Sequence, residues 1–165
     1  QALISGTKAE VVNVGDSRAY HLDPLGLVQV TRDHTMASEA QKEGAFAAAE
    51  VAASPWSGAL ARYLGAGKDI EVDYFGPFEI EKGGWLLLCS DGLHRVFSNE
   101  DLERELGAGT DPEAVARTLV EEALKRETDD NVSVALAYRP GPQRVSSTSV
   151  EGLEGRTGRK DVSTD

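Results

Sequence analysis

The stretch WLLLCSDG, residues 85–92, joins an uninterrupted apolar run to an aspartate followed by glycine. The apolar run Trp85–Cys89 follows a Gly83-Gly84 turn and predicts a strand that is buried on both faces. Asp91 comes just after this strand, so we expect its carboxylate at the rim of a sheet.

Short extended segments and one alanine-rich segment precede the buried strand. The extended segments share alternating or β-branched apolar residues and are joined by short turns; they cover residues 1–5, 9–14, 18–23, 27–30 and, more weakly, 71–75. Because the connections are short, we expect antiparallel pairing. Residues 35–53 are rich in Ala, Glu, Gln and Lys, which predicts a helix that Gly44 divides or ends.

Two helices and a last strand are predicted after the buried strand. Ser98 is the expected N-cap of the first helix, with Asp101 completing a variant capping box, and Gly107 is its expected end. Asp111-Pro112 opens the second helix. Its apolar residues recur at helical spacing, which indicates core packing; they are Val115, Leu119, Val120, Ala123 and Leu124. The last strand is predicted over residues 132–138.

The composition is that of a globular domain with an acidic excess. The chain has 165 residues, 28 of them acidic and 17 basic, with a formal net charge of −11. This balance argues against a protein that binds nucleic acid through a basic patch, and it suits a site that collects divalent cations. The single cysteine, Cys89, allows no intrachain disulfide, and its apolar neighbours predict a buried, unreactive thiol. No apolar run approaches the ~20 residues of a membrane span, and no signal peptide is visible, so we expect a cytoplasmic protein.

The two ends of the chain carry separate expectations. Gln1 opens the chain inside a strand-like segment, which predicts N-terminal truncation or processing. Residues 140–165 are rich in Gly, Ser, Thr, Arg and Asp, which predicts a disordered polar tail or linker. The expected domain therefore covers residues 1–139.

Three aspartates lie next to predicted strand ends. Asp16 follows an early strand, Asp91 follows the buried strand, and Asp130 precedes the last strand. Each local motif alone is ordinary turn chemistry. If the three strand ends lie side by side, however, the carboxylates converge, and their repulsion is relieved by a hard cation with oxygen ligands. The sequence therefore predicts a divalent-metal site.

Taken in order, the motifs resemble those of the protein phosphatase 2C family, and most of all its bacterial members, which dephosphorylate phosphoserine and phosphothreonine on proteins. The resemblance runs from Ala2 to about Tyr138. The segments that carry it are Gly15-Asp16-Ser17-Arg18, Thr31-Arg32-Asp33-His34, Ser90-Asp91-Gly92 and Asp130-Asn131.

The resemblance implies both a fold and a cofactor. The fold is α+β, a four-layer α-β-β-α sandwich of antiparallel sheets flanked by helices, of which this chain would form the C-terminal part. The cofactor is a centre of two Mn²⁺ or Mg²⁺ ions, with a possible third, that activates a water for attack on phosphorus. The implied partners are phosphorylated proteins and a cognate serine/threonine kinase.

Roles for individual residues follow from the resemblance. Asp91 and Asp130 are expected as direct metal ligands, and Asp16 as a ligand of a third, weaker metal. Asn131 and Gly92 are expected to support these ligands without binding metal.

The resemblance also implies a mobile flap near the active site that contributes to substrate choice. It occupies residues 36–58, with His34, Met36 and Arg62 as its candidate residues. For His34, a structural or capping role is favoured over catalysis.

Two departures from the family pattern leave alternatives open. The Asp-Gly-x-Gly-Gly segment and the earlier acidic ligand of the family's N-terminal half are not in this chain. Arg95 stands four residues after Asp91, where many relatives carry an acidic residue at the third metal. The chain is thus interpreted as part of an active phosphatase, as a pseudophosphatase with a binding or regulatory role, or, less favoured, as an acidic interaction domain with a fold-level resemblance only.

Overall fold

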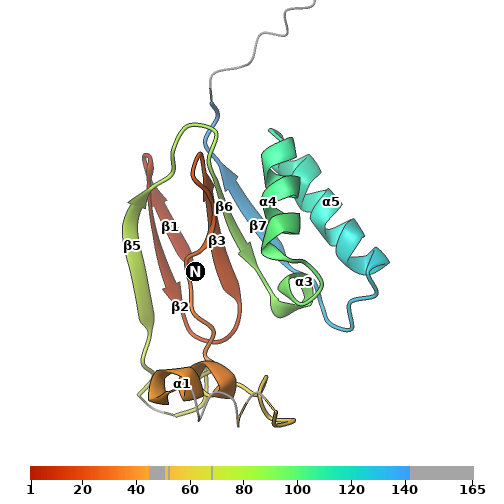
Figure 1. The fold of residues 1–165 in the computed structure, drawn as a ribbon. Helices are drawn as coiled ribbons and strands as arrows, with labels where there is room; N and C mark the ends of the chain where they lie inside the picture. The colour runs from red at the N-terminus through yellow and green to blue at the C-terminus, as the bar shows by residue number, and fades with distance from the viewer. Residues whose placement is uncertain (45–50, 52, 68, 142–165) are drawn as a thin grey trace, which may run out of the picture.

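The computed structural model describes residues 1–44, 51, 53–67 and 69–141, and the strands among them form two antiparallel sheets packed face to face (Figure 1). One sheet has the order β1-β2-β5 and the other the order β4-β3-β6-β7. The strands are β1 Ala2–Ser5, β2 Lys8–Asn13, β3 Arg18–Asp23, β4 Gly26–Gln29, β5 Asp73–Glu79, β6 Trp85–Cys89 and β7 Val134–Tyr138. The antiparallel pairing expected from the short connections is confirmed.

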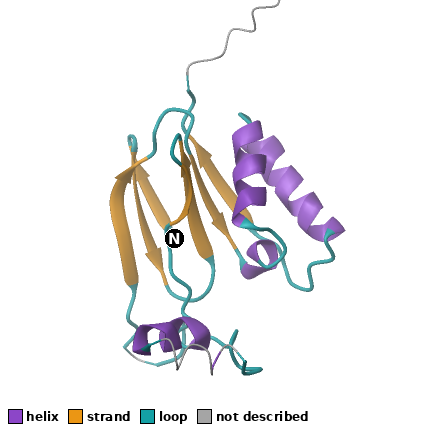
Figure 2. Ribbon diagram, in the orientation of Figure 1, coloured by secondary structure: helices purple, strands orange, loops and turns teal. Residues whose placement is uncertain are grey.

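Helices cover one outer face of this pair of sheets. The helices are α1 Met36–Glu43, α3 Asp91–His94, α4 Asn99–Ala108 and α5 Pro112–Lys125. Figure 2 shows α4 and α5 side by side against the four-stranded sheet, whereas α1 lies beyond one end of the sheets. Among the described residues the layers therefore run sheet, sheet, helix, which is three of the four layers that the resemblance implies.

Strand β6 lies at the centre of the fold, as its apolar sequence predicts. It pairs with β3 on one side and β7 on the other. Leu86 faces the three-stranded sheet and packs in the same cluster as Val11, while Leu87 faces the helices and packs with Leu119. Both leucines are buried. The alternation of side chains along one strand thus holds the sheet–sheet core and the sheet–helix core together.

Helix α4 follows its predicted start but not its predicted end. The Ser98 side chain accepts the N–H of Asp101, and the reciprocal bond completes the capping box. The expected end at Gly107 is wrong, because the helix continues through Ala108 and is capped at Gly109. Leu106 in the last turn is fully buried, and that packing outweighs the cost of one glycine inside a helix, about 1 kcal/mol.

Two other boundaries differ from the expectation. Strand β5 runs on to Glu79 through Gly76-Pro77, beyond the predicted residues 71–75. Proline is tolerated there because β5 is an edge strand and donates no hydrogen bond from that position. Strand β7 begins at Val134, two residues later than expected, because the residues before it form a loop against Ser90.

The predicted ends of the chain and of the alanine-rich segment fall partly outside the described residues. Helix α1 ends at Glu43 with Gly44 as its C-cap, as Gly44 was expected to end or divide it. The rest of the expected helix in residues 45–50 and 52 lies outside the described residues, as does the expected disordered tail beyond Gly141.

Candidate metal centre

The register of the four-stranded sheet brings the three aspartate-bearing loops to one edge. Arg18 at the start of β3 pairs with Cys89 at the end of β6, and Cys89 pairs with Val134 at the start of β7. The loops that lead into β3 and β7 and out of β6 therefore leave the sheet side by side. This side-by-side arrangement of the loops is the condition on which the expected convergence of the three carboxylates depends.

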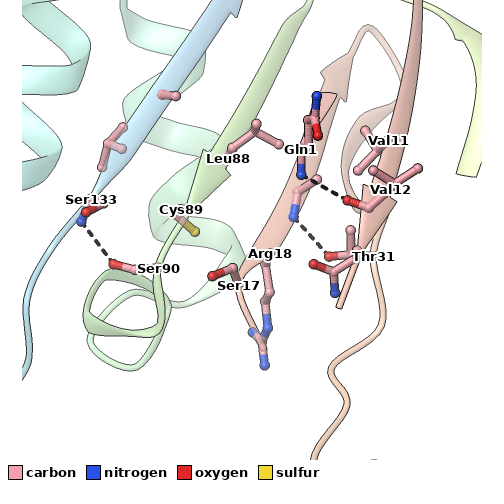
Figure 3. Close-up of a pocket in the computed structure, with 14 residues that line it drawn as sticks. Gln1, Val11, Val12, Ser17, Arg18, Thr31, Leu88, Cys89, Ser90 and Ser133 are labelled. Carbon is pink, nitrogen blue, oxygen red and sulfur yellow. Dashed lines mark hydrogen bonds between the residues drawn. The ribbon is translucent and has the colours of Figure 1, made fainter. Parts of the chain in front are cut away.

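Ser90 joins two of these loops by hydrogen bonds. Its hydroxyl donates to the carbonyl oxygen of Asn131 at 2.9 Å and accepts the N–H of Ser133 at 2.9 Å. Its own N–H donates to the carbonyl oxygen of Ser133 at 3.0 Å. Figure 3 shows Ser90 and Ser133 facing each other across the ends of β6 and β7. The loop that carries Asp91 is thus fixed to the loop that carries Asp130.

Gly92 and Thr128 bring the same two loops closer still. A Cβ atom on Gly92 would lie 2.5 Å from the carbonyl oxygen of Asn131 and 3.1 Å from that of Asp130. The Thr128 hydroxyl donates to the carbonyl oxygen of Gly92 at 2.7 Å. Glycine at position 92 is therefore required by close backbone packing. Thr128 carries no motif of its own in the sequence, and only its nearness to Asp130 could have drawn attention to it.

The carboxylates of Asp91 and Asp130 have matching surroundings. In each, Oδ1 accepts the N–H of the next residue, Gly92 at 3.0 Å and Asn131 at 2.7 Å. In each, Oδ2 faces the guanidinium of Arg95, at 2.6 Å from Asp91 and 3.8 Å from Asp130. The expected supporting residues Gly92 and Asn131 thus contact the carboxylates through their backbone N–H groups. One oxygen of each carboxylate remains directed at a single cation.

Asp16 is tied to the same region through its backbone. The carbonyl oxygen of Asp16 lies 3.0 Å from Nε2 of His94, which belongs to α3. Burial lowers the pKa of His94, which favours a neutral imidazole that donates from Nε2 to this carbonyl. Among the residues that the structure describes, no cluster of three or more His, Cys, Asp or Glu side chains has a metal-binding arrangement. Asp91 and Asp130 are linked by their shared contact with Arg95, and the Asp16 carboxylate does not complete a three-ligand set with them.

His34 holds the Asp16 turn from the opposite side. It is 1% exposed, and its Nδ1 accepts the N–H of Gly15 at 3.1 Å. Its Nε2 lies 3.2 Å from Oδ2 of Asp73. A structural position for His34 agrees with the role favoured for it from the sequence.

Of the other expected flap residues, Arg62 forms ion pairs and Met36 is exposed. Arg62 pairs with Asp73 at 3.0 Å and with Glu39 of α1 at 3.4 Å, so it links α1 to β5. Met36 opens α1 and is 45% exposed. Of the expected flap, residues 45–50 and 52 lie outside the described residues.

Arg18, two residues after Asp16, forms an ion pair with Asp33. It donates to both carboxylate oxygens of Asp33, at 2.7 Å from Nη2 to Oδ2 and 2.9 Å from Nε to Oδ1. It also donates to the Tyr20 hydroxyl at 3.0 Å. These contacts occupy the guanidinium, so Arg18 fixes the start of β3.

A pocket of about 370 Å³ lies between the two sheets (Figure 3). Ser90 and Ser133 line its rim, but Asp91 and Asp130 do not line it. Cys89 also lines the pocket, and burial raises the pKa of its thiol to about 12. The pocket is therefore distinct from the candidate metal centre, and the Cys89 thiol is buried, as expected from the sequence.

Comparisons with known proteins agree with this geometry. The serine/threonine phosphatase stp of Listeria monocytogenes is 31% identical over 149 residues, which cover 90% of this chain and 58% of that protein. The solved serine/threonine phosphatase of S. agalactiae superposes with a TM-score of 0.76 at 29% identity, covering 84% of this chain and 57% of that one. The chain belongs to the protein phosphatase 2C family. No protein-family model matches it.

A third relative was solved with metal ions bound. The catalytic domain of the serine/threonine protein phosphatase PstP, solved in complex with two manganese ions, has a TM-score of 0.62 at 29% identity and covers 82% of this phosphatase 2C chain and 55% of that one. The chain thus spans little more than half of the length of these three relatives. No helix in the described part of the chain is long and apolar enough to cross a membrane.

Proposed function

We propose that this chain supplies the C-terminal part of a metal-dependent phosphatase that hydrolyses phosphoserine and phosphothreonine on proteins. The observation that carries the proposal is the pairing of Asp91 and Asp130, whose loops are fixed to each other and whose Oδ2 atoms face one cation. The relatives with this sequence pattern are serine/threonine phosphatases, and one of them binds two manganese ions.

The donor set fits a hard divalent cation in part. Carboxylate oxygens suit Mn²⁺ and Mg²⁺, and Mg²⁺ is commonly held by one or two carboxylates together with waters and substrate phosphate. Asp91 and Asp130 supply two such carboxylates, each already oriented by a backbone N–H. Bound metals would supply an activated water and offset the charge on the phosphoryl oxygens. The third ion proposed near Asp16 has weaker support, because that carboxylate does not join the pair.

The residues of this chain would hold and orient the metals and would not themselves act as nucleophile. Ser90, Gly92 and Thr128 fix the two carboxylate-bearing loops, and fixed ligands reduce the reorganisation that the reaction requires. In the overall reaction a water oxygen bonds to phosphorus, the phosphorus–oxygen bond to serine or threonine breaks, and the leaving oxygen takes up a proton. The substrate flap is proposed around His34, Met36 and Arg62.

Two protein carboxylates are too few for a centre of two metals, so we propose that an N-terminal segment completes it. The curated and solved relatives extend well beyond the length matched here. Both sheets of this chain end in edge strands, and such a segment could pair with one of these strands. We further propose phosphorylated proteins as the substrates, a cognate serine/threonine kinase as a partner and a cytoplasmic location.

The test is phosphatase activity of the intact gene product on a phosphothreonine peptide with Mn²⁺. We expect Asp91→Asn and Asp130→Asn each to lower kcat at least 100-fold, because loss of a metal ligand removes charge stabilisation in the transition state. Glu121→Gln on the exposed surface of α5 is the control for loss of one negative charge and should leave activity unchanged. Activity retained in both aspartate variants would refute the proposal.

The alternative is a pseudophosphatase that binds partners without turnover. The observation that favours it is that the guanidinium of Arg95 forms ion pairs with both Asp91 and Asp130. Under this alternative the intact gene product has no Mn²⁺-dependent activity, and Asp91→Asn leaves its binding function unchanged. The activity measurement on the unaltered protein therefore separates the two.

A further inference from the structure

The carboxylate pair has a cation of its own in the guanidinium of Arg95. Arg95 caps the C-terminal end of α3, with its backbone N–H bonded to the carbonyl oxygen of Asp91 at 3.0 Å. Its side chain turns back over the same helix and reaches Oδ2 of Asp91 at 2.6 Å and Oδ2 of Asp130 at 3.8 Å. The backbone N–H groups of Gly92 and Asn131 donate to the Oδ1 atoms of the two aspartates, so these Oδ2 atoms are the ones left for Arg95.

Arg95 differs in this from the other arginines near the site. Arg18 is fixed by two bonds to Asp33, and Arg126 by Asp101 and the carbonyl oxygen of Val96. In the part of the chain that the structure describes, the ion pairs of Arg95 are with the two proposed metal ligands. Its place therefore reflects the attraction of this carboxylate pair for a cation.

The Arg95 ion pairs are weak enough to exchange. The Arg95 side chain is 48% exposed, that of Asp130 is 44% exposed and that of Asp91 is 21% exposed. Ion pairs that remain open to solvent in this way contribute little to stability. A divalent ion carries twice the charge and prefers carboxylate oxygens, so it competes favourably for the same two atoms. The guanidinium must then leave Oδ2 of both aspartates.

We propose that Arg95 is a built-in competitor of the divalent cation: it holds Asp91 and Asp130 together without metal and is displaced when metal binds. Arg95 thereby sets the metal concentration at which the centre fills. This inference rests on the proposed function, because it takes the carboxylate pair as the metal site. It concerns regulation of that site through a residue where the family resemblance gives an acidic one.

The test measures metal affinity in the full chain and does not depend on turnover. Mn²⁺ binding is followed by electron paramagnetic resonance for the unaltered chain, Arg95→Gln, Arg95→Lys and the control Arg117→Gln. Arg117 is a matched control because it is also an exposed arginine paired with an acidic residue four positions earlier, Glu113 at 3.0 Å, on helix α5. Asp91→Asn shows which part of the binding belongs to the site.

We expect Arg95→Gln to tighten Mn²⁺ binding about three- to tenfold, since the competing charge is lost, and Arg117→Gln to leave it unchanged. Arg95→Lys should lie near the unaltered chain, because it keeps the charge. In the unaltered chain, titration with Mg²⁺ should shift the Nε–H resonance of Arg95 in a nitrogen–proton correlation spectrum as the ion pair breaks.

Several outcomes overturn the inference. They are equal affinity in Arg95→Gln and the unaltered chain, weaker binding in Arg95→Gln, equal tightening in Arg117→Gln, and no binding in any variant. Failure of the proposed function is a different result. If Arg95→Gln tightens binding but the intact gene product does not hydrolyse phosphothreonine, the competitor role stands and the phosphatase proposal falls.

Discussion

Gly92 lies where two loops approach so closely that a side chain has no room. The carbonyl oxygen of Asn131 is 2.5 Å from the place of a Cβ atom on Gly92. We expect Gly92→Ala to lower the free energy of unfolding by about 1–3 kcal/mol, because the backbone of the Asp130 loop must shift. Gly107→Ala is the matched control, since nothing lies within 4 Å of its Cβ position inside α4.

The Gly107→Ala control should change the free energy of unfolding in the opposite direction. Alanine in a helix interior is more favourable than glycine by about 0.5–1 kcal/mol, so Gly107→Ala should raise the free energy of unfolding. Denaturation by urea measures both changes. If Gly92→Ala is as stable as the unaltered chain, the loops are not held as closely as the structure describes.

At the scale of single residues, the sequence predicts the candidate metal ligands but not the side chains that contact their loops. Asp91 and Asp130 could be proposed from their places at strand ends, because the sequence fixes local position. The bond of Thr128 to the carbonyl oxygen of Gly92 spans 36 positions, and the reach of Arg95 to Asp130 spans 35. Such contacts depend on how the loops fold back on each other, which no local pattern specifies.

Helix α4 is the element whose beginning is most clearly encoded. Ser98 accepts the N–H of Asp101 at 3.1 Å, and this satisfies one of the N–H groups left free at a helix start. We expect Ser98→Ala to lower the free energy of unfolding by about 1 kcal/mol. Thr118→Ala, at an exposed position within α5, should change it little or raise it slightly, because alanine is the better helix former.

Thermal unfolding followed by circular dichroism compares these two variants. Equal stability of Ser98→Ala and the unaltered chain would mean that α4 is held by its packing alone. That packing is substantial, since Leu102 and Leu106 of α4 are fully buried. It also explains why the predicted start was confirmed and the predicted end at Gly107 was wrong. A cap is a local interaction that the sequence displays, whereas the end of α4 is set by contacts with distant residues.

At the scale of the whole molecule, the two faces of the three-stranded sheet differ sharply. Its inner face is buried against the four-stranded sheet through Ala9 and Val11. On its outer face, Leu3 is 64% exposed and Tyr74 is 55% exposed. Register places both there, because Leu3 pairs with Glu10 and Tyr74 with Val12, the residues that alternate with the buried ones. This is the face on which the fourth layer of the sandwich is expected.

The covering of both faces of β6 could therefore be predicted from the sequence, but the sequence does not show what covers the outer face of the three-stranded sheet. The alternation along β6 specifies that something covers both of its faces, and the structure supplies the helices and the second sheet. The outer face of β1 and β5 carries the same kind of apolar residue without a described helix over it. The proposed N-terminal segment would cover Leu3 and Tyr74, and this expectation can be tested separately from activity.

Leu3→Ser should have different effects in this chain and in the intact gene product. In the isolated chain Leu3 is already exposed, so the free energy of unfolding should change by no more than about 0.5 kcal/mol. In the intact gene product we expect a loss of about 1.5–3 kcal/mol, because a leucine side chain buried by the additional layer would be lost. Leu25→Ser is the control, since Leu25 is 97% exposed in the turn between β3 and β4 and should be neutral in both proteins. If Leu3→Ser and Leu25→Ser are equally neutral in the intact gene product, the outer face of this sheet is a free surface, and the completing segment docks elsewhere.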